Sequence, residues 1–143
     1  MREALTLGKP WRVVNLSEEY GLHDAGVKML VKEGLHQHAA VLLQKKAFHT
    51  YVQQLSKLMD YEKKILEYWA KPEAKLEIEP KKLRVLRKTI VQNLKQAIAY
   101  FKKAEDYYSK AGKTLDANYA KRDRMLAFHL LEHVQAERKK FFT

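Results

Sequence analysis

The chain has 143 residues, of which 28 are Lys or Arg and 17 are Asp or Glu, giving a formal net charge of +11. This length suits one domain with its own core, and the charge bears on partners and solubility rather than on fold. The absence of cysteine excludes disulfides, thiol nucleophiles and zinc–cysteine sites.

The composition predicts an all-α protein, because five Gly and three Pro are too few for a chain rich in turns. We expect a helical bundle built on a long antiparallel helical hairpin: an extended N-terminal arm (1–16) precedes a single helical domain (17–143). The apolar runs are short, so we expect neither a secretory signal nor a membrane span. The lack of cysteine and the abundant Lys, Glu and Tyr fit a thermophilic source.

The first 16 residues lack helical spacing, and Gly8 and Pro10 punctuate them. The apolar side chains in this segment allow two interpretations. Either the N-terminus packs on the core of its own chain, or it is an extended arm that reaches a neighbouring subunit. The candidate subunit contacts are Trp11, Val13 and Val14. Ser17 is a candidate N-cap for a helix near 18–33, which we expect to bend or break at a glycine.

The second predicted helix, 35–70, carries an apolar seam with steps of three and four. The seam comprises Phe48, Val52, Leu55, Met59, Leu66 and Trp69, with Glu62 as its polar member. The first part of this helix, 35–59, contains no acidic residue but holds Lys45, Lys46 and Lys57. Pro72 ends the helix and Pro80 begins the next one.

The third predicted helix, 80–111, has an apolar stripe of Leu83, Leu86, Ile90, Leu94, Ala97 and Phe101. Residues 80–104 contain no acid, and four lysines recur every seven residues: Lys81, Lys88, Lys95 and Lys102. Seven residues are almost two helical turns, so these lysines form one row along the helix. Like charges so placed repel one another, which indicates an external polyanion. Gly112 ends this helix, and a fourth is predicted over 115–141.

This charge pattern predicts non-specific binding of nucleic acid through phosphates. Residues 34–104 hold fifteen basic and six acidic residues, whereas residues 1–33 hold five of each. Folding the hairpin sets 46–59 opposite 91–104, so the acid-free stretches meet. The predicted binding residues are Lys45, Lys46, Lys57, Lys81, Arg84, Arg87, Lys88, Lys95, Lys102 and Lys103. No motif that reads base sequence is present.

Catalytic and metal-binding motifs are weak in this sequence. His129, Glu132 and His133 form an H-x-x-E-H pattern, but the zincin order of these residues is absent. There is no phosphate loop and no nucleophile elbow. We expect no enzyme activity, no cofactor, no small-molecule substrate and no metal site.

The basic hairpin, the N-terminal arm and the helical C-terminus together resemble the major capsid proteins of filamentous archaeal viruses of the lipothrixvirus and tristromavirus type. The likeness covers most of the chain but rests on architecture, with no diagnostic motif. It implies a helical nucleocapsid around double-stranded DNA, often built from heterodimers, with the DNA in A form. It also implies self-assembly or a paralogous partner, and a location in the virion or otherwise in the cytoplasm.

Two other functions fit the same features. A small helical subunit of an RNA-guided, CRISPR-type ribonucleoprotein complex would need a similar basic face. A helical protein–protein adaptor would use its charge to meet an acidic partner. A coat protein is expected to cover duplex continuously, an effector subunit to prefer single strands, and an adaptor to ignore both.

Overall fold

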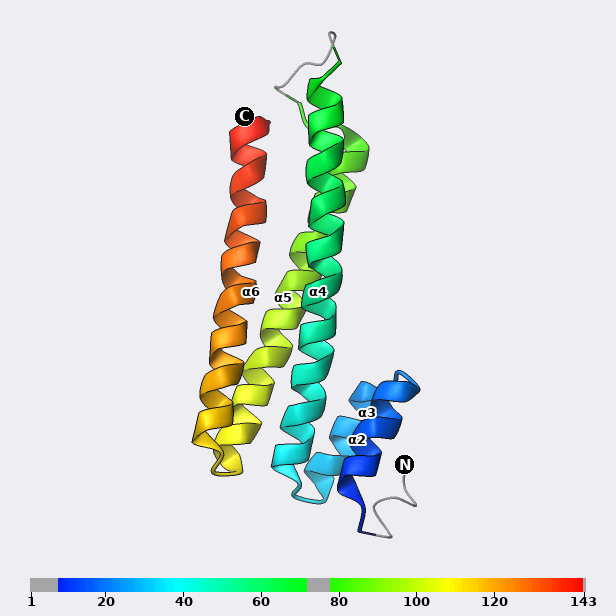
Figure 1. Cartoon of the computed structure of the whole chain (residues 1–143), viewed down its shortest axis with the longest axis vertical. Coiled ribbons are helices and arrows are strands. Elements are labelled where there is room, and N and C mark those ends of the chain that lie inside the picture. The colour runs from blue at the N-terminus through cyan, green and yellow to red at the C-terminus, as the bar shows by residue number, and fades with distance from the viewer. Residues whose placement is uncertain (1–7, 72–77, 143) are drawn as a thin grey trace.

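Figure 1 shows the computed structural model of the chain, which describes residues 8–71 and 78–142. These residues form five α-helices and no β-strand, so the all-α prediction is confirmed. Three long helices run along the long axis of the molecule, and two short ones lie beside the first half of the first long helix. The helices are α2 (Pro10–Glu19), α3 (His23–Lys32), α4 (His36–Trp69), α5 (Lys81–Lys110) and α6 (Thr114–Phe141).

The hairpin of α4 and α5 is antiparallel, as predicted. Ala47 shares a buried cluster with Phe101, and Leu58 shares one with Ile90 and Leu94. The stretches 46–59 and 91–104 therefore do lie opposite each other. Residues 72–77, which make up most of the predicted turn, lie outside the described residues.

The predicted apolar stripe of α5 is buried at five of its six positions, and Leu86 is partly buried. Each large side chain removed from water in this way contributes about 1.5–3 kcal/mol. α5 uses this stripe against both α4 and α6, whereas α4 and α6 contact each other little. Both α4 and α6 therefore pack mainly on α5 (Figure 1).

Two helix ends follow the expected chemistry. Gly112 has a φ of +73°, and the backbone N–H of the next residue, Lys113, donates to the carbonyl of Tyr108 at 2.8 Å. This arrangement satisfies a carbonyl at the end of α5, where glycine adopts the left-handed conformation without steric cost. Pro80 precedes the first residue of α5, and its carbonyl accepts from the N–H of Arg84 at 2.9 Å.

The prediction that residues 10–16 are extended is wrong. They form most of α2, with Pro10 in the first turn, where a missing N–H costs nothing. Val13 and Val14 are buried in one cluster with Leu30 and Leu42, so they pack inside the chain and not against another subunit. The remainder of the predicted arm, residues 1–7, lies outside the described residues.

The helix predicted near 18–33 is broken at a glycine, as expected, but its start is different. Gly21, with a φ of +67°, separates α2 from α3. Ser17 is not an N-cap: it is buried within α2, and its hydroxyl donates to the carbonyl of Val13 at 2.6 Å.

The seam predicted on α4 does not form the core. The buried face lies one residue earlier, at Ala47, Gln54, Leu58, Tyr61 and Ile65, which is a rotation of about 100°. We call the exposed members of the predicted seam the α4 stripe; they are Phe48, Val52, Met59, Leu66 and Trp69. At Ala47 the small side chain packs with Phe101 of α5 and Ala127 of α6.

The apolar residues of α6 also divide into exposed and buried sets. Leu115, Tyr119 and Leu126 are exposed, whereas Leu131 and Val134 are buried against α5 and α4. None of the helices in the described parts of the chain is long and apolar enough to cross a membrane.

Candidate nucleic-acid interface

The lysine row lies on the outer face of α5. Lys81, Lys88 and Lys95 are exposed, and each precedes a buried residue of the α5 stripe by two positions. Two residues turn a helix by about 200°, so these side chains point away from the bundle. Their spacing along the helix axis is about 10.5 Å, enough for each ammonium group to reach a different phosphate.

These three lysines have no acidic partner within residues 8–71 and 78–142, since none of the ion pairs formed there includes them. Lys102, the fourth member of the row, differs. Its ammonium group lies 3.4 Å from Asp106 and 3.9 Å from Glu105 of the same helix. The uncompensated part of the row therefore spans 81–95.

Lys57 and Lys103 are also exposed and take part in no ion pair among the described residues. Lys57 precedes Leu58, which packs against Ile90 and Leu94, so it lies level with the middle of α5. Lys103 borders a cavity of about 620 Å³ between α3, α4 and α5.

Lys45 and Lys46 are held by the two N-terminal helices. Lys45 pairs with Glu18 of α2 and Lys46 with Asp24 of α3, both at 2.9 Å. The Lys46 ammonium also lies 4.5 Å from the ring centroid of Tyr100. Burial alone would lower the pKa of Lys46, but its contacts with Asp24 and Tyr100 outweigh that effect and raise it. These two ion pairs link α2 and α3 to α4.

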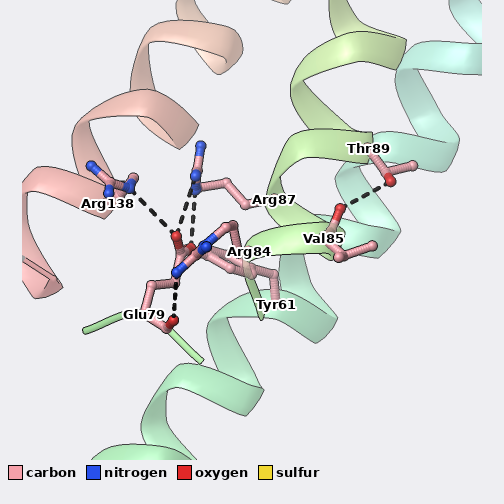
Figure 2. Close-up of polar contacts among 7 residues, drawn as sticks. All are labelled: Tyr61, Glu79, Arg84, Val85, Arg87, Thr89 and Arg138. Carbon is pink, nitrogen blue, oxygen red and sulfur yellow. Dashed lines mark hydrogen bonds and ion pairs between the residues drawn. The ribbon is translucent and has the colours of Figure 1, made fainter. Parts of the chain in front are cut away.

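Arg87 is committed to a buried carboxylate and is not free to meet a phosphate. Figure 2 shows its guanidinium against Glu79, with Nε donating to Oε1 at 3.0 Å and Nη2 to Oε2 at 3.2 Å. The side chain of Arg87 is 12% exposed and that of Glu79 only 1%. Arg84 is exposed, and it donates to the backbone carbonyl of Glu79 at 3.4 Å.

Glu79 joins all three long helices. In addition to its contacts with Arg87 of α5, Glu79 accepts a hydrogen bond from the Tyr61 hydroxyl of α4 at 3.0 Å. Its Oε2 also lies 3.4 Å from Nε of Arg138 on α6 (Figure 2). Burial by itself would raise the pKa of Glu79, but the hydrogen bonds and charges of these partners together lower it. Burial and the Glu79 charge raise the pKa of Tyr61, so its hydroxyl stays a donor.

Trp11 is the one predicted subunit contact that is still accessible. Its ring lies 4.2 Å from that of His38 on α4, and about half of the side chain is exposed. Sequence reasoning did not single out Glu79 or Arg138. The one available signal for Glu79 was an acid directly before the Pro80 helix start in an otherwise basic region.

Comparison with protein-family models, with curated proteins and with solved structures found no match. The resemblance to filamentous-virus capsid proteins therefore stays a prediction from the sequence.

Proposed function

We propose that this protein coats double-stranded DNA and assembles along it as a filamentous nucleocapsid of the kind found in the resembled viral family. The observation that carries the proposal is the row of Lys81, Lys88 and Lys95. These exposed cations lie on one outer helix face without an acidic partner in the described part of the chain. When such lysines neutralise the phosphates of a polyanion, the counterions condensed on that polyanion are released into solvent, which favours binding.

The mode of binding follows from the shape of this face. A straight helix presenting ammonium groups offers contacts to phosphates, which carry no base identity. Lys57, Lys103 and Arg84 are further exposed cations of the hairpin. Lys45, Lys46 and Arg87 are left out of the contact set because acidic side chains already hold them.

The opposite side of the bundle supports assembly. Met59 and Leu66 of the α4 stripe are 74% and 68% exposed. At its C-terminal end the stripe meets α6, where the Trp69 and Phe141 rings lie 5.8 Å apart. Exposed apolar side chains gathered along one helix mark protein contact surfaces. A coat subunit needs both faces, one for phosphates and one for neighbouring subunits.

The proposal is tested by measuring the affinity for labelled duplex DNA by fluorescence anisotropy at several salt concentrations. In the variant Lys81→Gln/Lys88→Gln/Lys95→Gln, the slope of log affinity against log salt should become shallower by about 0.9 per lost contact. The loss should be the same for unrelated sequences. Electron microscopy of the wild type should show filaments with duplex and none without it.

A matched control removes three charges from the ends and outer face of α6, in the variant Lys113→Gln/Lys121→Gln/Lys139→Gln, and should keep the wild-type slope. Equal slopes in the two triple variants would show that only net charge matters and would remove the row from the proposal. Binding to single strands but not duplex would favour the ribonucleoprotein subunit. Binding to neither would favour the adaptor, whose supporting observation is the α4 stripe.

A further inference from the structure

Three potential metal ligands, one from α4 and two from α6, lie close together between these helices. Glu62 of α4 and His133 and Glu137 of α6 each place one ligand atom within 4.8 Å of the other two. The His133 Nε2 lies 3.0 Å from Glu137 Oε1 and 3.6 Å from Glu62 Oε1. Two ligands held at 2.0–2.2 Å from a tetrahedral zinc ion stand about 3.4 Å apart. The observed separations lie on both sides of that value.

The burial of Glu137 is a second, independent observation that points to a bound cation. Its side chain is only 9% exposed, and its Oε2 has no hydrogen-bond partner among the described residues. A buried carboxylate oxygen without a partner is costly. A divalent cation bound by both oxygens of Glu137 would satisfy the buried Oε2 and neutralise both carboxylates.

We propose that Glu62, His133 and Glu137 form a site for one divalent transition-metal ion, Zn²⁺ by preference, which links α4 to α6. The imidazole ligand favours zinc and its neighbours over Mg²⁺ or Ca²⁺, which take oxygen ligands. With three protein ligands, the fourth position belongs to water. Because Glu62 and His133 are half-exposed, the ion can enter from solvent.

The site would act as a structural tie. α4 and α6 pack on α5 but contact each other little, so their separation is set mainly through α5. A neighbouring cavity of about 100 Å³ is lined by Ile65, Leu66 and Phe141 with the two glutamates. A metal bridge would fix the distance between the two helices beside the α4 stripe.

The test uses the full chain, stripped of metal with a chelator and titrated with ZnCl₂ by calorimetry. We expect one ion per chain and a Tm that rises with added Zn²⁺. His133→Gln and Glu137→Gln should each weaken binding at least tenfold, since even indirect partners of a metal are worth 10–100-fold. The control is His129→Gln, which alters an exposed histidine paired at 3.6 Å with Glu132 on the same helix.

Circular dichroism of the metal-free variants checks that each one folds. The chemically conservative change Glu137→Gln removes a buried charge, so it should fold at least as stably as the metal-free wild type and still fail to respond to Zn²⁺. Absence of Zn²⁺ binding by the wild type would overturn the proposal. An equal loss of Zn²⁺ affinity in the His129 and His133 variants would also overturn it, because binding would then be a general property of surface histidines. A stoichiometry of one ion per two chains would overturn it because the site would then lie between chains.

Discussion

At the scale of single residues, Glu79 stands out because a nearly fully buried carboxylate meets groups from three helices. Removing one partner of a buried ion pair leaves the other charge uncompensated, which costs about 3–5 kcal/mol. We therefore expect Glu79→Gln to lower the free energy of unfolding by about that much in urea titrations. The exposed pair of Glu18 and Lys45 is the matched control, and Glu18→Gln should cost less than about 1 kcal/mol.

The pH dependence of the Glu79 contribution has a definite sign. The pKa of Glu79 is lower in the folded state than its ordinary value, because Arg87, Tyr61 and Arg138 together outweigh burial. The stability that ionised Glu79 provides is therefore present above the ordinary pKa and is lost as pH falls through the lowered one. The difference in unfolding free energy between wild type and Glu79→Gln should shrink under acid. A difference that stays constant down to strongly acidic pH would contradict this account.

At the scale of elements, Gly26 of α3 lies close to Ser17 of α2 and Leu42 of α4. A Cβ added at Gly26 would collide with the Ser17 hydroxyl and lie 2.8 Å from the Leu42 Cδ2 atom. Alanine in a helix gains about 1 kcal/mol over glycine, but overpacking costs about 1–3 kcal/mol. Because the obstacles lie on two other helices, we expect Gly26→Ala to destabilise the chain in urea unfolding.

The background variant Ser17→Ala provides the control for this prediction. It removes the hydroxyl that the new Cβ would meet, so Gly26→Ala should cost less in that background. An equal cost of Gly26→Ala in both backgrounds would mean that the Ser17 hydroxyl is not the obstacle.

The elements also show what a sequence can and cannot predict. The helical period located α4, α5 and α6 to within one or two residues, and it identified the α5 stripe because one narrow arc there is apolar. On α4 two apolar arcs adjoin, and periodicity could not tell which one packs. Proline in the first turn of α2 was mistaken for a helix breaker.

The candidate site was predictable only in part, for a related reason. The row of Lys81, Lys88 and Lys95 follows from helical spacing alone. The partners of Lys45 and Lys46 are Glu18 and Asp24, more than twenty residues earlier, so sequence distance concealed them. Glu62 and His133 belong to different helices, and their meeting depends on how α4 and α6 pack.

At the scale of the whole molecule, the α4 stripe should govern association between subunits. In Met59→Gln/Leu66→Gln the exposed side chains become polar without loss of core packing, so Tm should change little. Filament formation on duplex should weaken, as seen by electron microscopy, while binding at low protein-to-DNA ratio should persist. The control Val85→Gln alters an exposed apolar residue on α5, away from the stripe. Filaments of normal length from the double variant would exclude the stripe as an assembly surface.

The lysine row also sets a charge balance for any coat that this chain builds. From Lys81 to Lys102 the row extends about 32 Å, close to one turn of B-form duplex at about 34–36 Å. One such turn carries about 20 phosphate charges, whereas each chain supplies +11. One chain per turn would leave about nine phosphate charges for mobile cations to balance. Two chains per turn would exceed neutrality by about two positive charges. For a duplex in B form, rather than the A form that the resemblance implies, electroneutrality would place the proposed coat at between one and two chains per turn.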